Sequence, residues 1–330
     1  MVRKISLGFV LVLVISAAIY FRSHHTKHPL GVAYAGDRNV ILWSTSAQVR
    51  EPVAAVSFGE RLVVLDHFED QVEVRTPSGV VGWTTDQELL SADLWQKAQD
   101  LAARAASLPV EARGATRVLS NLHLEPSRES QRISQLGKEV PVELFERRAV
   151  EVPVAAPSGE GAEEEEPPSQ PDSARKEDWW LVRAHPPGQA PLAGWVLGRF
   201  IDLDVPPPLP DYATSAALRI VAWFVLDRVP GGAGADVGND RPQYLVLGAH
   251  GPEGDPCDFT SIRVYTWSRK NQRYETAYVE SALCGALPVT LSPPRVPGGE
   301  VTFEFEDIGN GTPEKRIYRM VQTVVRRVKE

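Results

Sequence analysis

The residues of this sequence that are chemically equipped for catalysis gather around one of its two cysteines. Cys257 follows His250 closely and is flanked by Asp255 and Asp258, whereas Cys284 stands further along the chain. A nucleophilic cysteine needs a histidine held beside an activated thiolate. No motif typical of cell-wall cysteine peptidases surrounds either cysteine, and carboxylates in loops are usually solvated. The spacing alone therefore does not define a catalytic site.

Other catalytic motifs are missing from the sequence as well. It contains no His-Glu-x-x-His, phosphate loop, dinucleotide fingerprint or Gly-x-Ser-x-Gly elbow. Such motifs hold nucleophiles, bases, phosphates or metals in a fixed geometry. We therefore expect no enzyme and no cofactor. A cell-wall hydrolase or peptidase with an unrecognised catalytic C-terminal domain is the alternative.

The two cysteines also have a structural interpretation. Two thiols are too few for a structural zinc site, and outside the cytoplasm a disulfide is the default for such a pair. Cys257 precedes a predicted hairpin and Cys284 follows it, so a bridge between them would hold the base of the hairpin. Two unpaired, buried cysteines are the alternative.

Two clusters of metal-ligand residue types are better explained as solvated segments. His24, His25 and His28 lie on a predicted stalk, which provides no fixed geometry for a metal ion. The acidic run 163–166 lies in a polar stretch, whereas calcium binding needs a preorganised cage of oxygen atoms. We predict no metal site.

An uncharged apolar segment, residues 5–21, opens the chain after Arg3 and Lys4. As a helix it would span about 25 Å, near the lower limit for crossing a bilayer. We predict a signal anchor or transmembrane helix over 1–22, single-pass in the bacterial cytoplasmic membrane, with the body outside the cytoplasm. Cleavage followed by secretion stays open, although the small-x-small triplet 33–35 lies far downstream.

The composition is that of a chain with a folded core, with 43% hydrophobic and 24% charged residues. The formal net charge of −8 argues against nucleic acid as a partner and against an anionic membrane surface. The 330 residues leave room for two or three domains, since a domain usually takes about 100–150 residues.

Two stretches of the chain share one order of features. Each has a glycine before an alternating run, then a second short run, then a Gly-Trp pair. These features are Gly59, 72–75 and Gly82-Trp83 in the first stretch, and Gly137, 179–183 and Gly194-Trp195 in the second. Alternating runs punctuated by Gly, Pro and Ser predict short strands joined by turns. Curling such strands into a small barrel removes exposed edges and encloses a core.

The order Gly-x-x-Val-x-Val, Trp-x-x-Val-Arg, Gly-Trp-Val resembles the bacterial Src-homology-3-like (SH3-like) domain, and the second stretch matches it better. The resemblance covers about 40–90 and 115–204. It implies small β-barrels that bind cell-wall peptides or other proteins. Trp179 stands where the family usually has a tryptophan. Gln71 stands there in the first stretch, which weakens the transfer of aromatic-groove binding to that copy.

Five tryptophans are candidate core or binding residues. Trp83 and Trp195, from the Gly-Trp pairs, are predicted to pack in the barrel cores. Trp43, Trp179 and Trp180 are candidate ligand-binding residues. Because neighbouring side chains on a strand point to opposite faces, Trp179 and Trp180 cannot share one core. We expect one of them to face a groove or a neighbouring module.

The connecting and C-terminal segments complete the layout. An apolar stripe over 92–107, with Ser91 as a cap and Pro109 as a stop, predicts a helix. The C-terminal third carries six candidate strands, which predict an antiparallel sheet of no recognised family. Its first and last segments, 218–228 and 316–328, are alternatively helical.

The predicted fold is mostly β: an N-terminal transmembrane helix, two small SH3-like barrels joined by a helix, then an antiparallel β-sheet domain. The segments are an anchor (1–22), a stalk (23–38), barrel 1 (39–91), a helical connector (92–112), barrel 2 (113–204) with an acidic disordered insertion (150–176), a Pro-rich linker (205–211) and a C-terminal domain (212–330). We expect a membrane-anchored envelope binding or scaffold protein that engages peptidoglycan or an envelope protein.

Overall fold

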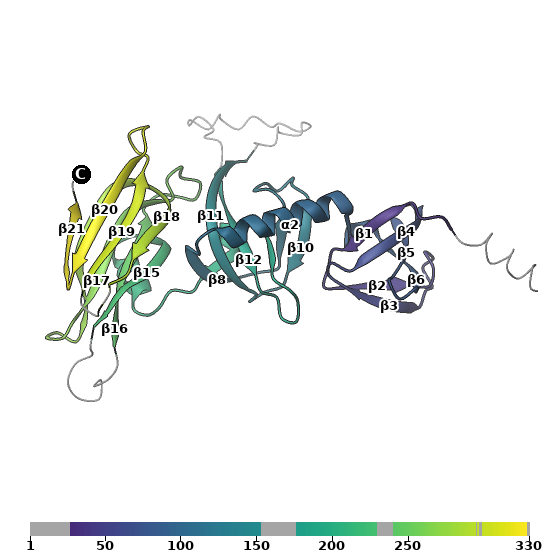
Figure 1. Ribbon diagram of the computed structural model, residues 1–330, viewed down its shortest axis with the longest axis horizontal. Coiled ribbons are helices and arrows are strands. Elements are labelled where there is room, and N and C mark those ends of the chain that lie inside the picture. Colours follow the sequence, from purple (N-terminus) through teal and green to yellow (C-terminus); the bar gives the residue numbers. More distant parts are fainter. Residues whose placement is uncertain (1–26, 153–175, 230–239, 295, 297–298, 329–330) are drawn as a thin grey trace, which may run out of the picture. The chain divides into compact units, whose positions relative to one another are not determined.

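The computed structural model describes residues 27–152, 176–229, 240–294, 296 and 299–328 (Figure 1). It divides into two compact units, Met1–Lys97 and Ala98–Glu330. The predicted anchor and nearly all of the predicted acidic insertion lie outside the described residues. Among the described helices, none is both long enough and apolar enough to cross a membrane. The prediction of a mostly β fold built from antiparallel sheets is confirmed, because the described strands form three antiparallel seven-stranded sheets.

The first sheet belongs to the first unit and has the strand order β3-β2-β6-β5-β4-β1-β7. Its strands are β1 (Gly31–Ala35), β2 (Asn39–Trp43), β3 (Pro52–Ser57), β4 (Arg61–Phe68), β5 (Gln71–Arg75), β6 (Val81–Thr85) and β7 (Leu89–Ser91). Alternate residues such as Val40 and Leu42, or Val72 and Val74, turn inward and form one buried core.

Strand β1 corrects the predicted stalk, which was to extend to residue 38. Gly31–Ala35 pairs with β4 on one side and with β7 on the other, so it is an inner strand of the first sheet. Ala33 and Ala35 are buried in the core, at 7% and 0% exposed. Small alanines give only a weak apolar alternation, so the strand is inconspicuous in the sequence.

Helix α2 (Ala92–Ser107) confirms the predicted connector. Ser91 Oγ accepts a hydrogen bond from Leu94 N–H at 3.1 Å, which caps the first turn as expected. In the first unit, the Trp95 ring stacks on Tyr34 with centroids 4.8 Å apart. Gly59, at φ +77°, lies under the same ring, and a Cβ there would meet Trp95 at 2.6 Å.

The second sheet lies in the second unit and has the order β10-β9-β13-β12-β11-β8-β14. Its strands are β8 (Ala112–Thr116), β9 (Ser120–His123), β10 (Arg132–Leu136), β11 (Pro141–Glu151), β12 (Lys176–Ala184), β13 (Leu192–Leu197) and β14 (Ile201–Leu203). Taken along the chain, the seven strands follow the same order as those of the first sheet. The internal repeat expected from the sequence is thus confirmed at the level of topology.

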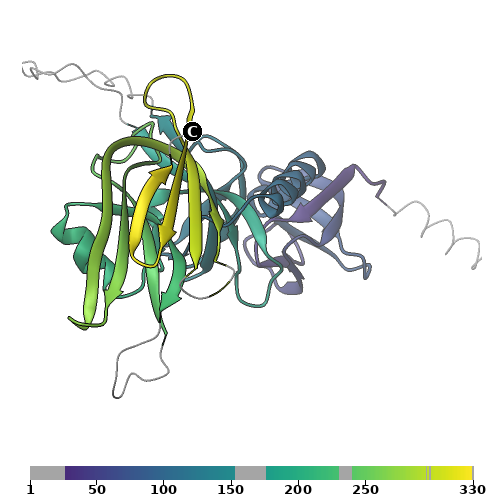
Figure 2. The ribbon, with the colours of Figure 1, turned by 60° about the vertical axis from the view of Figure 1, so that its left-hand side comes forward.

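The third sheet is an antiparallel meander whose strands follow chain order from β15 to β21. They are β15 (Arg219–Val229), β16 (Arg241–Ala249), β17 (Phe259–Ser268), β18 (Arg273–Ser292), β19 (Glu300–Asp307), β20 (Glu314–Val321) and β21 (Val324–Val328). Figure 2 shows these strands, green to yellow, as one curved layer. The first and last segments are strands, so their helical alternative is wrong. The last segment is a hairpin that turns at Gln322, with φ 57°.

The predicted Pro-rich linker is wrong in its second half. Helix α3 (Leu209–Ser215) begins inside it, with Pro210 in its first turn, where proline sacrifices no helical hydrogen bond. Leu209 and Ala213 are buried against Tyr244, Val246 and other residues of one face of the third sheet. The second half of the predicted linker is therefore held by the packing of this short helix against the third sheet, and not by the stiffness of its prolines.

Candidate functional site

The two adjacent tryptophans of β12 lie on opposite faces of the second sheet, as predicted from strand alternation. Both are buried, with Trp179 2% and Trp180 6% exposed. Trp179 lines one hollow of the surface and Trp180 lines another, so neither shares a core with its neighbour. Each is therefore a wall of a possible ligand site.

The other three candidate tryptophans divide differently. Trp195 is 2% exposed, as a core residue should be, with the Arg148 guanidinium 5.3 Å from its ring centroid. Trp83 is only half-buried and has Lys27 Nζ 5.6 Å over its ring, so it lies outside the fully buried core. Trp43 is also half-buried, and Arg50 covers its ring at 4.6 Å.

The hollow beside Trp179, which we call the Trp179 groove, is the first candidate site. It holds about 320 Å³ and is lined mainly by Leu119, Asn121, His123, Arg128, Gln135, Trp179 and Phe200. That volume is at the lower end of small-molecule sites, which span about 300–1,000 Å³. The lining comes from β9, β10, β12 and the segments that flank β9 and β14.

The floor of the Trp179 groove is aromatic and its edge is apolar. The His123 ring meets Trp179 edge-on, with centroids 5.3 Å apart, and His123 Nδ1 lies 3.0 Å from the Ser130 carbonyl oxygen. Leu119 is 62% exposed at the edge. A large apolar side chain left in water beside an aromatic floor is typical of a binding surface.

Polar side chains also line the Trp179 groove, among them Asn121, Arg128 and Gln135. Glu177 is almost fully buried and accepts hydrogen bonds from Arg128 at 2.9 and 2.5 Å and from Arg199 at 2.9 Å. These arginines, with Arg128 the largest cause, hold the pKa of Glu177 below its usual range despite burial. Glu177 therefore stays ionised and fixes Arg128, whose side chain is half exposed, beside the groove. Asn121 and Gln135 pair their amides at 3.2 Å.

The repeat places Gln71 in the first sheet where Trp179 lies in the second. Gln71 pairs with Thr85 on β6, just as Trp179 pairs with Leu197 on β13. Gln71 Oε1 accepts a long hydrogen bond from Arg50 at 3.4 Å. The first sheet therefore has an amide at the strand position that an aromatic ring occupies in the second sheet.

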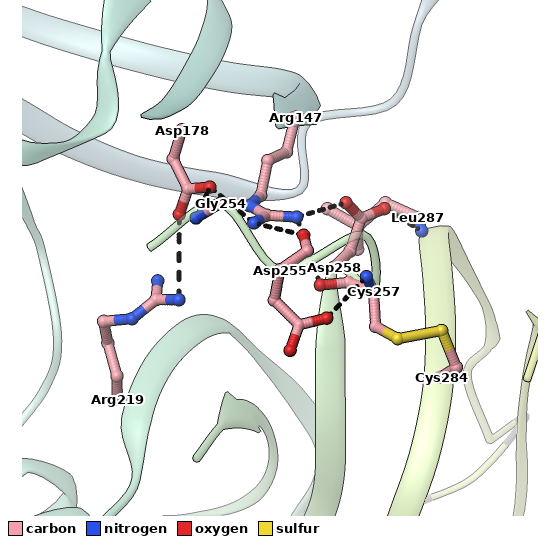
Figure 3. Close-up of polar contacts among 9 residues, drawn as sticks. All are labelled: Arg147, Asp178, Arg219, Gly254, Asp255, Cys257, Asp258, Cys284 and Leu287. Atoms are coloured by element: carbon pink, nitrogen blue, oxygen red, sulfur yellow. Dashed lines mark hydrogen bonds and ion pairs between the residues drawn. A yellow bond between two sulfur atoms is a disulfide. The ribbon is translucent and has the colours of Figure 1, made fainter. Parts of the chain in front are cut away.

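A second polar cluster lies where the second sheet meets the third within the second unit (Figure 3). Arg147 of β11 is 1% exposed in its side chain and reaches the turn before β17. It donates to Asp178 at 2.5 Å, to Asp258 at 3.1 Å, and to the backbone carbonyls of Asp255 and Cys257. Asp258 Oδ2 in turn accepts from Leu287 N–H at 2.8 Å. No sequence motif predicts this cluster, because its members lie on separate strands and in a turn.

The predicted disulfide is confirmed. Cys257 and Cys284 are bonded, with their Cα atoms 4.7 Å apart, and the bridge sits at the base of the β17–β18 pair. The Cys257 end of the disulfide lies in the same turn before β17 whose backbone carbonyls accept hydrogen bonds from Arg147. Neither thiol is free, so neither cysteine is available as a nucleophile in this state.

Two carboxyl groups of this junction, one buried and one mostly buried, have raised pKa values. Burial raises the pKa of Glu111 to about 7; a hydrogen bond from Val289 N–H opposes the shift, and the charge of Asp258 adds to it. Burial likewise raises the pKa of Asp258, although Arg147 opposes it. The expectation that loop carboxylates are solvated is therefore wrong for Asp258. Glu111 Oε1 is buried and has no hydrogen-bond partner among the described residues.

The remaining expectations concern metals and the suspected histidine. Among the described residues, no group of three or more His, Cys, Asp or Glu side chains is arranged to hold a metal ion. His28 is exposed, and His24 and His25 lie outside the described residues. His250 Nδ1 lies 3.4 Å from Thr260 Oγ1.

Comparison with known proteins found no matching protein-family model and no matching curated protein. Solved structures do match. NlpC2 from Trichomonas vaginalis has 9% identity over 92% of this chain and 98% of its own, with a TM-score of 0.18. An NlpC/P60 family protein from Bacillus cereus has 11% identity over 76% of this chain and 94% of its own, with a TM-score of 0.23. NlpC1 from Trichomonas vaginalis has 8% identity over 78% and 92%, with a TM-score of 0.18.

These neighbours correct one expectation from the sequence. The prediction that the chain is not an enzyme is wrong on this comparison, since all three structures are NlpC or NlpC/P60 proteins, and we do not maintain it. The TM-scores of 0.18–0.23 are too low to transfer a fold or a catalytic residue to this chain. The site must therefore be argued from its own residues.

Proposed function

We propose that this chain works at the bacterial cell wall and that its second sheet is an SH3-like module binding peptidoglycan peptides in the Trp179 groove. The resemblance of the second stretch to SH3-like domains supports the proposal, with Trp179 in the position of the family's tryptophan. The disulfide fits a body that lies in an oxidising compartment outside the cytoplasm. Anchoring of the body by the N-terminal segment is part of the same proposal.

The observation that carries the proposal is that the groove combines a buried aromatic ring with an exposed apolar side chain and with polar side chains. An extended peptide could lay an aliphatic side chain between Leu119 and Phe200, both of which line the groove. Its amide groups could exchange hydrogen bonds with Asn121 and Gln135, and a carboxylate could meet Arg128. Wall peptides carry all three kinds of group.

Sedimentation with purified peptidoglycan tests the proposal. The full chain in mild detergent is incubated with the wall and centrifuged, and the bound fraction is measured. Leu119→Ser removes an exposed apolar side chain from the groove and should weaken binding about tenfold. Val324→Ser is the matched control, because Val324 is 54% exposed on the third sheet. Equal binding of the Leu119 variant and the unmodified chain would exclude the groove.

A wall hydrolase is the second candidate function, and the NlpC/P60 names of the solved structures bring it forward. The same incubation separates the two. Retention of the chain on intact wall supports binding, whereas soluble wall fragments in the supernatant show hydrolysis. With both thiols bonded, a hydrolase would need another nucleophile or prior reduction of the disulfide.

A further inference from the structure

A second cleft lies on the opposite face of β12, between the second and third sheets of the second unit. We call it the Trp180 cleft; Trp180, Asp178 and Arg199 line one side, and Arg219, Ile220 and Val221 line the other. It holds about 340 Å³. Clefts between packed modules are a common place for small-molecule sites, and this volume lies within their usual range. Nothing in the wall-binding proposal uses this cleft.

Within the described residues, one oxygen of the Asp178 carboxylate accepts hydrogen bonds and the other does not. Oδ1 accepts from Arg147 Nη2 at 2.5 Å and from Gly254 N–H at 2.8 Å. Oδ2 accepts no hydrogen bond from any described residue and faces Arg219 Nη2 at 3.7 Å, beyond hydrogen-bond distance (Figure 3). The Asp178 side chain is 3% exposed, so this oxygen is a nearly buried acceptor at the wall of the cleft.

Arg219 is the complementary group across the cleft. Its side chain is 39% exposed, and it makes the long ion pair with Asp178 but no hydrogen bond within the described part of the chain. A guanidinium has five N–H donors, so most of its hydrogen-bonding capacity faces the cleft and water. The cleft thus presents an acceptor and a cationic donor beside each other, and the two do not satisfy one another.

An apolar surface lies next to this polar pair. Trp180 is 6% exposed, Val221 is 2% exposed, and Ile220 is half-buried, and all three line the cleft. An aliphatic or aromatic side chain of a ligand would be removed from water there. The ligand that matches has adjacent positive and negative groups and an apolar tail.

We infer that the Trp180 cleft binds a free α-amino acid with an apolar side chain, its ammonium group donating to Asp178 Oδ2 and its carboxylate accepting from Arg219. In an α-amino acid the two charged groups are attached to one carbon atom, so they can meet an acceptor and a guanidinium that lie side by side. Both hydrogen bonds join charged groups, which makes them stronger than neutral ones. The site discriminates by charge at both ends of the ligand.

Titration of the full chain with three small ligands tests the inference. The ligands are leucine, N-acetylleucine and leucinamide, each in both enantiomers, and binding is measured by calorimetry and by the fluorescence of the chain. Leucine should bind, and loss of either charge should weaken binding about tenfold or more, because one charge-assisted hydrogen bond is removed. N-acetylleucine loses the contact with Asp178, and leucinamide loses the contact with Arg219.

Substitutions provide the second arm of the test. Arg219→Gln should weaken the binding of leucine and of N-acetylleucine about tenfold, because both carry the carboxylate, and should leave leucinamide little changed. Arg273→Gln is the matched control, because Arg273 is an exposed arginine of the third sheet that faces Glu275 at 3.6 Å, much as Arg219 faces Asp178. The control should bind leucine like the unmodified chain.

Three results would overturn the assignment of the Trp180 cleft as an amino-acid site. The cleft is not an amino-acid site if leucine shows no saturable binding, or if N-acetylleucine binds as tightly as leucine. Unchanged leucine binding by the Arg219 variant would overturn it equally. The comparison of blocked and free ligands uses the unmodified chain and so does not depend on the folding of any variant. It is also independent of wall binding through the Trp179 groove, which is measured on an insoluble wall.

Discussion

Replacing Glu111 by Gln should make the chain more stable at neutral pH and leave its stability unchanged in acid. Glu111 is 2% exposed, and its Oε1 has no hydrogen-bond partner in the part of the chain that the structure describes. Burial of the carboxylate raises its pKa from the ordinary value of 4.5 to about 7. Glutamine keeps the size of the side chain and can still accept from Val289 N–H, but it has no charge to bury.

The sign and size of the expected change in unfolding free energy follow from proton linkage. Because the pKa of Glu111 is higher in the folded chain, the folded state binds more protons than the unfolded state between about pH 4.5 and 7. Stability therefore falls as pH rises through this window: the contribution of the protonated group is complete below about pH 4.5 and lost above about pH 7. The difference between about 7 and 4.5, at about 1.4 kcal/mol for each pKa unit, gives about 3 kcal/mol.

The assay is urea unfolding of the unmodified chain and of Glu111→Gln at a series of pH values from 4 to 8. The difference in unfolding free energy between the two reports on Glu111, including its charge interaction with Asp258, because the other titrating groups are common to both. It should be near zero at pH 4 and favour the variant by about 3 kcal/mol at pH 8. Glu125→Gln, at an exposed glutamate, should show no such trend. A difference that stays constant with pH would refute the reasoning.

Two further predictions concern the same junction. Replacing Cys257 and Cys284 together by serine should lower the unfolding free energy by about 3.5 kcal/mol, since the disulfide closes a loop with a sequence separation of 27. Thermal melts with and without reductant measure the loss. An unchanged melting temperature would contradict a stabilising role of the disulfide. Arg147→Met should cost about 3–5 kcal/mol, because it leaves Asp178 and Asp258 buried without their cation. Arg148→Met, at a neighbouring arginine that is 51% exposed, should cost less than about 1 kcal/mol in the same urea titration, and equal losses for the two variants would contradict the buried network.

The repeat and the helix could be predicted from the sequence because both rest on local patterns. Gly-Trp pairs and alternating runs mark strands wherever they occur, and the stripe of α2 begins and ends at its expected residues. The position of Gln71 opposite Thr85 and of Trp179 opposite Leu197 confirms that these two residues are equivalent in the two sheets. Local periodicity carried this information.

Elements and contacts that depend on long-range pairing were missed. Strand β1 consists largely of small residues and is fixed by its pairing with β4 and β7. The continuation of β18 past Cys284 to Ser292 is fixed by β19, which takes over from β17 as its partner. The Arg147 cluster joins residues more than a hundred positions apart, and no spacing in the sequence points to it.

The proposed wall-binding function is tested most directly at the Trp179 groove itself. The chain can be labelled with 5-fluorotryptophan at its eight tryptophans and titrated with soluble peptidoglycan peptides while fluorine NMR spectra are recorded. Single replacements by Phe assign the resonances. The account predicts saturable shifts of the Trp179 resonance with little change at Trp43 and Trp83. Saturable binding that leaves Trp179 unmoved and shifts another tryptophan, or no binding of any wall peptide, would contradict it.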